Sequence, residues 1–319
     1  MAEILSLLIK TNPNIVGFIL NGDEFKLTQF ADDTTLILDG TQHSLQSALN
    51  TIEIFGNFSG LRMNKEKTKV VWLGKKKLSK DKLNVSEQLD WGKSEFTLLG
   101  IDFSTNIKAM SDINYGSAVQ KIKAEIRKWE SRALTPLGKI TVIKTLLLSK
   151  IIHLLTSLPT HKSMLDEINR MFYQFLWSKK PDKISRQSIC MDFCDGGLKM
   201  INIYDFEKSL KVGWIRKIIF DQKSQWYKLL TNICGSLDNL LIMGGEWCCV
   251  LSKKVKNNFW ADVFESWQLL TKKLNISTEQ EIAEYCIWNN YNISREKLYF
   301  SKWFKKGIHL VGDIIDING

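Results

Sequence analysis

The chain has 319 residues, of which 44% are hydrophobic and 24% are charged. This composition is typical of a globular protein of two or three units, and it excludes a disordered chain. The net charge of +10 is concentrated in residues 61–180, which hold 23 Lys/Arg against 11 Asp/Glu, whereas residues 1–60 hold 2 against 7. A basic block of this kind attracts phosphate backbones and anionic membrane surfaces, and a solvated Lys-rich surface is the alternative interpretation.

The first third of the chain alternates strand and helix patterns. Asn21-Gly22 lies between two apolar runs and is typical of a two-residue hairpin turn. A second hairpin follows, with Ala31-Asp32-Asp33 at its tip. Strand, strand, helix, strand is half of a ferredoxin-like sheet with helices on one face. In order, we predict a helix at 2–10, strands at 14–20, 24–30 and 34–38, a helix at 42–58 closed by Gly60, and a strand at 68–73.

The remainder of the chain changes to a helical period. From Tyr115 onward, apolar residues recur on one stripe while Lys and Arg lie off it. Thr135-Pro136 supplies an N-cap and a first-turn proline for the second of three consecutive helices, a long one that ends at Pro159. Such a bundle with basic outer faces can lie against a duplex. In order, we predict a Lys-rich loop at 75–93, a strand pair at 96–104 bent at Gly100, helices starting at Tyr115, Thr135 and Ser163, and a Trp-rich helical region after Pro181.

Six cysteines are scattered through the second half of the chain, and no signal peptide precedes them. Free thiols in a reducing compartment are the default interpretation, so we expect an intracellular protein of the nucleus or cytoplasm that is neither secreted nor membrane-bound. Cys190 and Cys194 suggest zinc by their spacing, but no histidine completes a ligand set at the usual distance along the chain. A metal cluster is therefore not expected there.

The adjacent carboxylates Asp32 and Asp33 repel each other unless a cation lies between them. Mg²⁺ accepts one or two carboxylates plus substrate phosphates, and a pair of such ions can hold the attacking and leaving oxygens of a phosphoryl transfer in line. Asp is also common in ordinary turns, where it hydrogen-bonds its own backbone, and the dipeptide alone favours that interpretation. The choice between the two depends on the surrounding motifs.

Four motifs follow one another around and after this hairpin. They are "FADD" at 30–33, "SGLRMNKEKTKVVWLG" at 59–74, "LLGIDFS" at 98–104 and "WESRALTPLGKITVIKTLLLSKIIHLLTSLP" at 129–159. In order and spacing they resemble the reverse transcriptase of non-LTR (LINE-type) retrotransposons. Two later segments, "FLWSKKPDKISRQSI" at 175–189 and "GGLKMINIYDFEKSLKVGWI" at 196–215, resemble the region that follows the thumb in these enzymes. The resemblance covers essentially the whole chain.

The resemblance implies catalytic and binding roles for particular residues. Asp32 and Asp33 match the catalytic hairpin, with Asp32 as the more direct ligand of Mg²⁺ or Mn²⁺. Lys67 matches a palm lysine that protonates the departing pyrophosphate, and a solvated turn lysine is the alternative. Leu99-Gly100-Ile101 matches the primer grip, with a simple strand bulge as the alternative. The basic residues expected to bind nucleic acid are Lys121, Lys123, Arg127, Lys128, Lys139 and Lys144.

The implied fold class is α+β, in which a partial reverse-transcriptase palm with an antiparallel sheet and helices is followed by a three-helix thumb and a mostly helical C-terminal region. The implied domains are 1–110 for the partial palm with the FADD hairpin and primer grip, 111–180 for the helical thumb, and 181–319 for the post-thumb region. The implied partners are an RNA template, a DNA primer or an RNA–DNA hybrid, and deoxynucleotides in the intact enzyme, with no membrane. The sequence does not indicate an oligomeric state.

Two motifs of this enzyme family do not occur in the sequence. One is F-D-x-A-F-D, which supplies a third carboxylate from an earlier palm strand, and the other is Q-G-x-P-x-S-P, which shapes the nucleotide site. We therefore expect an N-terminally truncated polymerase fragment that is inactive alone. A non-catalytic nucleic-acid-binding module and a non-functional retroelement relic are the alternative interpretations.

Overall fold

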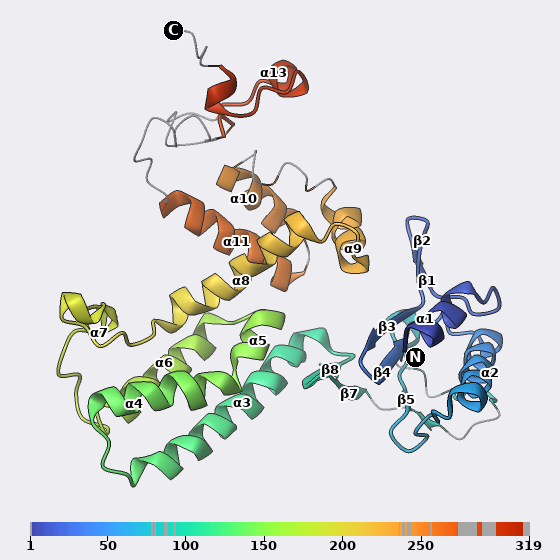
Figure 1. The fold of residues 1–319 in the computed structure, drawn as a ribbon, viewed down its shortest axis with the longest axis horizontal. Helices are drawn as coiled ribbons and strands as arrows, with labels where there is room; N and C mark the ends of the chain where they lie inside the picture. Colours follow the sequence, from blue (N-terminus) through green and yellow to red (C-terminus); the bar gives the residue numbers. More distant parts are fainter. Residues whose placement is uncertain are drawn as a thin grey trace. The chain divides into compact units, whose positions relative to one another are not determined.

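The computed structural model describes residues 2–77, 79, 81–85, 89–91, 94–235, 237, 240, 244–255, 257–273, 286–288 and 298–314. It divides the chain into two compact units, Met1–Met110 and Ser111–Gly319, whose elements are labelled in Figure 1. All the strands β1 to β8 belong to the first unit, and the described part of the second is helical apart from an isolated bridge between Cys286 and Leu310. The predicted α+β class is confirmed. The division into palm, thumb and post-thumb domains stays a prediction.

The N-terminal helix and the first hairpin follow the predicted pattern. Helix α1 spans Ala2–Thr11. Strands β1 (Phe18–Leu20) and β2 (Asp23–Phe25) pair antiparallel around Asn21-Gly22, whose φ angles of 51° and 89° are both positive, as a type I′ turn requires. Asn and Gly tolerate this backbone conformation better than other residues, because their steric cost there is small. The predicted hairpin turn is therefore confirmed.

Helix α2 (Gln42–Ser59) has the caps that its flanking residues predict. The Thr41 hydroxyl accepts a hydrogen bond from the Ser44 N–H at 3.2 Å, which pairs one of the N–H groups that a helix start leaves free. Gly60 ends the helix in the left-handed region with φ of 75°. A small core joins α1, α2 and strand β3 (Leu27–Phe30), and its buried residues are Ile9, Ile15, Leu27 and Ala48.

The predicted single palm sheet is not found among the described residues. Four separate two-stranded sheets are present instead, and strand β5 (Lys69–Val70) pairs in parallel with β6 (Asp90–Trp91) rather than with the aspartate hairpin. Trp72, just after β5, lies 5.7 Å from the Trp91 ring between centroids and donates its indole N–H to the Asp81 carbonyl at 2.8 Å. These contacts hold β5 against the loop that follows it, which the strand pattern alone could not reveal. The prediction of one antiparallel palm sheet was therefore wrong.

Helix α3 spans Ile107–Glu130, α4 Pro136–Val142, α5 Ile152–Ser157 and α6 Lys162–Leu176. Helices α4 and α6 begin close to where the sequence places them, whereas α3 begins at Ile107, well before the predicted start at Tyr115. The Thr135 hydroxyl accepts from the Gly138 N–H at 3.2 Å, and Pro136 occupies the first turn, as predicted. The third helix starts after His161, slightly before the predicted Ser163.

The long helix predicted from Thr135 to Pro159 is interrupted. A π-helical segment at Ile143–Leu147 and a 3₁₀ turn at Leu148–Lys150 separate α4 from α5. The hydroxyls of Thr141 and Thr145 donate to carbonyls four residues earlier, at 3.1 and 2.8 Å, a contact that bends helices. The prediction of one continuous helix was wrong. The spacing of apolar residues indicates which face of a helix is buried, but it does not show whether the backbone hydrogen bonds follow a regular α-helical pattern.

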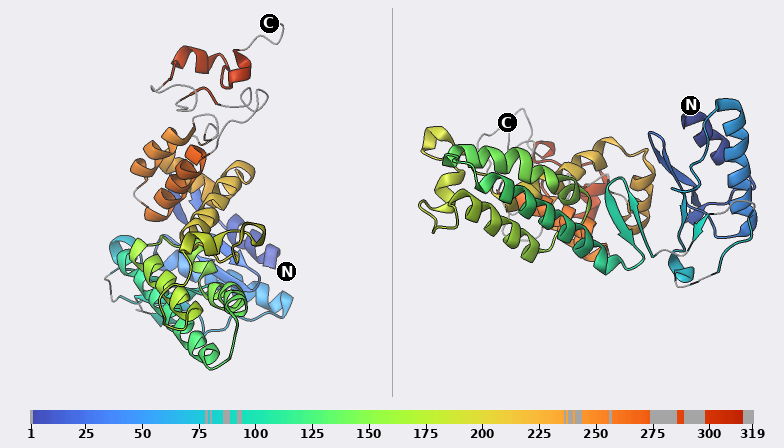
Figure 2. Two further views of the ribbon diagram at one scale, coloured as in Figure 1. Left: turned by 90° about the vertical axis from the view of Figure 1, so that its left-hand side faces the viewer. Right: turned by 90° about the horizontal axis from the view of Figure 1, so that it is seen from below.

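Helices α3 to α6 pack beside one another, as Figures 1 and 2 show. Lys123 of α3 pairs with Glu167 of α6 at 3.0 Å, and α4 packs directly on α6. Trp129, the last member of the predicted apolar stripe of α3, is half-buried. The other members are buried, and they are Tyr115, Ala118, Val119, Ile122 and Ile126. Burial of such a stripe is the main favourable contribution to docking a helix.

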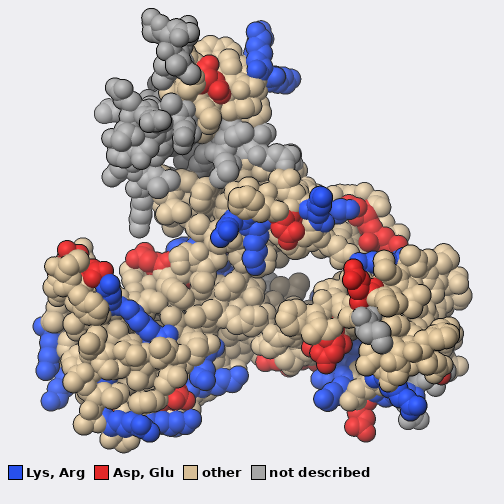
Figure 3. Space-filling view, in the orientation of Figure 1, with Lys and Arg blue, Asp and Glu red and all other residues tan. Residues whose placement is uncertain are grey.

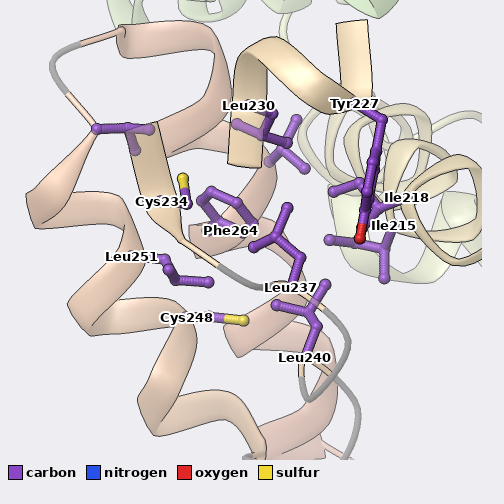
Figure 4. Close-up of a cluster of buried hydrophobic side chains, with 12 residues drawn as sticks. Ile215, Ile218, Tyr227, Leu230, Cys234, Leu237, Leu240, Cys248, Leu251 and Phe264 are labelled. Atoms are coloured by element: carbon purple, nitrogen blue, oxygen red, sulfur yellow. The ribbon is translucent and has the colours of Figure 1, made fainter. Parts of the chain in front are cut away.

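The described rest of the second unit is also helical, and part of it forms a separate hydrophobic core. Its helices are α7 (Arg186–Cys190), α8 (Ile203–Phe220), α9 (Gln225–Cys234), α10 (Gly244–Lys254), α11 (Asn258–Lys273) and α13 (Ser301–Lys305). Side chains from α8, α9, α10 and α11 converge in this core, in which Phe264 and Cys248 are fully buried (Figure 4). Within the described residues, the helical region predicted after Pro181 is confirmed.

Two ionisable side chains lie on the buried face of α8. Glu207 and Lys211 occupy the i+4 positions between the buried Ile203 and Ile215. The Lys211 ammonium donates to the Leu158 carbonyl at the end of α5, and burial lowers its pKa to about 8. Burial also raises the pKa of Glu207 above its ordinary value. The lysine therefore links α8 to the chain that follows α5.

Candidate nucleic-acid interface

The two predicted catalytic aspartates lie at an exposed hairpin of the first unit. Strand β3 pairs with β4 (Asp33–Leu36) so that Phe30 lies opposite Asp33, and Ala31 and Asp32 form the two-residue turn between them. Asp33 is thus the first residue of β4 rather than part of the tip. Both aspartates are exposed, and Ala31 has a φ of 52°, in the left-handed region.

This hairpin carries carboxylates on two consecutive exposed residues. Across the described residues, no group of three or more His, Cys, Asp or Glu side chains is placed to hold a metal ion. Mg²⁺ at phosphoryl-transfer sites takes one or two protein carboxylates and completes its shell with water and substrate phosphates, so Asp32 and Asp33 fit a partial shell. Their role as ligands of Mg²⁺ or Mn²⁺ stays a prediction.

Lys67 lies in a turn that Asn64 closes. The Asn64 side-chain oxygen accepts the Lys67 N–H at 3.1 Å, and the Thr68 hydroxyl donates to the Asn64 carbonyl at 2.7 Å. The spacing of Asn64, Lys67 and Thr68 therefore has a structural cause in this turn. Lys67 is exposed, and no hydrogen bond or ion pair between these described residues joins it to either aspartate. Its role as a proton donor stays a prediction.

The predicted primer grip forms a tight hairpin turn. Strands β7 (Glu95–Leu98) and β8 (Ile101–Ser104) pair with Leu98 opposite Ile101, so Leu99-Gly100 is a two-residue loop with φ angles of 50° and 78°. The register contains no extra residue, and the alternative of a strand bulge was therefore wrong. Leu99 is exposed at the tip, whereas Ile101 is buried. Contact with a primer stays a prediction.

The basic residues predicted to bind nucleic acid fall into two groups in the second unit. Lys121, Arg127 and Lys128 of α3 and Lys144 of the π-helical segment are exposed. Figure 3 shows Lys and Arg side chains along the edges of the part of the molecule that contains α3, α4 and α6. These helices bury their apolar stripes and leave the basic side chains in water, where they can reach phosphates.

The other two predicted residues are half-buried and have partners outside their own helices, whereas the exposed Lys128 pairs with Glu125 of its own helix at 3.3 Å. Lys123 pairs with Glu167, and the Lys139 ammonium donates to the Ser178 hydroxyl at 2.6 Å and to the Leu176 carbonyl at 3.4 Å. Lys139 thus pairs a carbonyl at the C-terminal end of α6, where a cation is favourable. Both lysines hold helices together in the structure, and their contact with nucleic acid stays a prediction.

A pocket that sequence reasoning missed lies beside Lys139. It is lined by Leu134, Pro136, Lys139, Leu176, Trp177, Ser178, Lys180 and Lys183. The only sequence signal for this pocket is the run Ser178-Lys179-Lys180, directly after the apolar end of α6. The hydrophobic periodicity alone predicts an ordinary basic loop for this run.

The fold and this surface define an α+β protein with a small strand-containing unit and a larger helical unit that exposes basic residues on α3 and after α4. No family model matches the chain. It is 22% identical over 130 residues, 39% of its length, to a protein of Arabidopsis thaliana described as "Putative ribonuclease H protein". The match covers 21% of that protein, so the chain spans about a fifth of the relative's length. Among the described residues, no helix is long and apolar enough to span a lipid bilayer.

Proposed function

We propose that this chain is the C-terminal part of an RNA-directed DNA polymerase of the LINE type, and that its helical unit binds a template–primer duplex through the phosphates. The observation that carries the proposal is the group of exposed basic residues, Lys121, Arg127, Lys128 and Lys144, on helices whose apolar faces are buried. The order of the four sequence motifs and the distant similarity to a protein described as a ribonuclease H protein support a nucleic-acid partner. An RNA–DNA hybrid is the partner that this proposal implies.

In this proposal the first unit supplies part of the polymerase site. Asp32 and Asp33 contribute carboxylates toward Mg²⁺ or Mn²⁺, Lys67 holds a proton near the leaving phosphate, and Leu99-Gly100 supports the primer end. The metal, when bound, would stabilise charge that develops on the transferred phosphoryl group. The exposed positions of both aspartates and of Lys67 leave them accessible to a nucleotide.

Salt dependence of hybrid binding tests the helical unit directly. The anisotropy of a short labelled RNA–DNA hybrid, titrated with the full chain at several salt concentrations, measures the affinity. We expect the logarithm of the association constant to fall linearly with the logarithm of salt, with a slope of about −0.9 per phosphate neutralised on B-form DNA as the reference. A flat salt titration, or no binding, would contradict the proposal.

Variants identify which Lys and Arg side chains contact the phosphates of the hybrid. The triple variant Lys121→Gln/Arg127→Gln/Lys144→Gln should bind more weakly at every salt concentration, and its slope should fall by about 1 for each phosphate that is no longer neutralised. The matched control Lys302→Gln/Lys305→Gln/Lys306→Gln removes the same charge from exposed residues at and just after α13. Equal reductions in affinity in the two variants would show that net charge, and not the α3–α4 surface, determines binding.

A binding module without catalysis is the second candidate. The observation that favours it is that the sequence does not contain F-D-x-A-F-D, the motif that carries the third carboxylate of the polymerase site. Both candidates predict the same duplex binding, and a primer-extension assay separates them.

A further inference from the structure

A small pocket lies between the start of α4 and the end of α6. It has a volume of about 190 Å³, below the roughly 300–1,000 Å³ of pockets that hold drug-sized ligands, so a small group fits it better than a whole nucleotide. Leu134, Pro136 and Leu176 give it an apolar side, and Lys139, Lys180 and Lys183 give it a cationic side. No Asp or Glu is among the described residues that line it.

The positive charge of this pocket is not neutralised by the carboxylates near it in the chain. Glu130 pairs with Lys179 at 3.2 Å, and Asp182 pairs with Arg186 at 2.8 Å. Lys180 and Lys183 are exposed at the rim. The Lys139 ammonium uses two of its three N–H groups on the protein, which holds it against the wall and leaves one donor. The pocket therefore concentrates uncompensated positive charge.

A residue that lines the pocket carries a buried donor without an acceptor in the protein. Trp177 lines it and is 6% exposed, and its indole N–H is buried with no hydrogen-bond partner in the protein. A buried donor left unpaired costs about 1–3 kcal/mol, so such an N–H ordinarily has an acceptor. The Ser178 hydroxyl accepts from Lys139 and keeps its own proton for donation. Every polar side chain of the pocket thus offers N–H or O–H donors.

We propose that this pocket binds one phosphodiester group of a nucleic-acid backbone. The inference rests on the proposed function, which supplies nucleic acid as the source of phosphate. A phosphodiester combines a negative charge with oxygen acceptors, which is the complement of three ammonium groups and a hydroxyl. A water molecule in the pocket would leave the charge of the lysines uncompensated. Bound there, the phosphate would fix the position of the duplex against the junction of α4 and α6.

The indole N–H of Trp177 provides a direct readout. In the full chain labelled with ¹⁵N at tryptophan, the Trp177 resonance is identified by its absence from Trp177→Phe, or by triple-resonance assignment if that variant does not fold. We expect a short RNA–DNA hybrid to shift this resonance, because a phosphate in the pocket would lie beside the Trp177 side chain. Inorganic phosphate, used as a competitor, should reduce the shift that the hybrid causes.

Lysine variants connect the resonance to affinity. Lys180→Gln/Lys183→Gln changes two exposed residues, so the fold should be kept, while the Trp177 shift should disappear and the salt slope of hybrid binding should fall by about 1 to 2. The control Lys302→Gln/Lys305→Gln removes the same charge at α13 and should retain the shift.

The outcomes separate this inference from the proposed function. If the hybrid binds but the Trp177 resonance does not move, or if the two lysine variants bind alike, the pocket is not a backbone site and the proposed function stands. If inorganic phosphate shifts the resonance and the hybrid does not, the ligand is a free anion and the inference is wrong. If the wild-type chain binds no hybrid, both fail.

Discussion

Ala31 has a backbone conformation that alanine rarely adopts. Its φ of 52° places it in the left-handed region, which costs a non-glycine residue about 1–2 kcal/mol, whereas glycine adopts it freely and loses about 0.5–1 kcal/mol in chain entropy. The difference predicts that Ala31→Gly stabilises the first unit by about 0.5–1 kcal/mol. Urea unfolding followed by circular dichroism measures the change.

The same substitution elsewhere is its control. Ala124 is exposed in the middle of α3, where glycine costs about 1 kcal/mol relative to alanine, so Ala124→Gly should destabilise the chain. A decrease in stability in both variants would contradict a strained turn at Ala31. A gain confined to Ala31→Gly would show that strain is stored beside the two aspartates, at the predicted catalytic position.

Lys211 makes stability depend on pH in the alkaline range. Desolvation lowers its pKa to about 8 against an ordinary 10.5, although Glu207 and Asp262 raise it and Lys208 lowers it further. Between pH 8 and 10.5 the unfolded chain binds more protons at this lysine than the folded chain does. The contribution of Lys211 to the unfolding free energy therefore rises with pH across this window.

Comparison with Lys211→Met isolates this contribution. The unfolding free energy of the wild type minus that of the variant should increase by about 2–3 kcal/mol from below pH 8 to pH 10.5. The subtraction removes the contribution of other groups that titrate in a similar pH range. One of them is Cys234, because burial raises its pKa to about 11. Urea unfolding at a series of pH values measures both curves, and parallel curves would show that the fold does not lower the pKa of Lys211.

At the scale of elements, the start of α4 depends on one hydroxyl. Thr135 accepts the Gly138 N–H at 3.2 Å, and the same end of the helix forms one wall of the lysine-lined pocket. Thr135→Ala should destabilise the second unit by about 1 kcal/mol, because the N–H loses its acceptor. Thermal or urea unfolding of the full chain measures the decrease in stability.

Two variants test whether this decrease comes from the cap. Thr135→Ser keeps a hydroxyl and should retain most of the stability. Thr145→Ala changes an exposed threonine in the π-helical segment of the same region and should be near neutral, since alanine favours helix. If Thr145→Ala costs as much as Thr135→Ala, the effect belongs to the irregular backbone and not to the cap.

At the scale of the whole molecule, binding and catalysis are expected to separate. The exposed basic helices of the second unit support duplex binding, whereas the first unit presents Asp32 and Asp33 without a third carboxylate from an F-D-x-A-F-D motif. We expect the purified chain to bind an RNA–DNA hybrid but not to extend a primer on an RNA template with Mg²⁺ or Mn²⁺, because two-metal transfer needs a complete ligand shell.

Primer extension also tests the polymerase assignment itself. Product formed by the wild type and absent with Asp32→Ala would show that the chain has a complete active site. Extension only after a related fingers-and-palm segment is fused ahead of Met1 would support the polymerase-fragment proposal over the binding module. Both aspartates are exposed, so Asp32→Ala should leave the unfolding midpoint nearly unchanged and serve as a folded control.

The sequence by itself determined the features that depend on neighbours along the chain. The Asn21-Gly22 turn, the caps at Thr41, Gly60 and Thr135, and the buried stripe of α3 all follow from residues within about one turn of each other. The exposed hairpin of Asp32 and Asp33 belongs to the same group. Local sterics and hydrogen bonds are sufficient to specify such elements. These elements can therefore be predicted before the packing of the chain is known.

Only the tertiary structure decided which segments meet. It paired β5 with β6 rather than with the aspartate hairpin, placed Lys123 and Lys139 against other helices, and brought Lys180 and Lys183 beside Trp177. A lysine that holds two helices together and one that lies at a pocket rim have the same sequence signal, a charge off the apolar stripe. Their difference arises from burial and from the acceptors supplied by distant residues, and those exist only once the chain has packed.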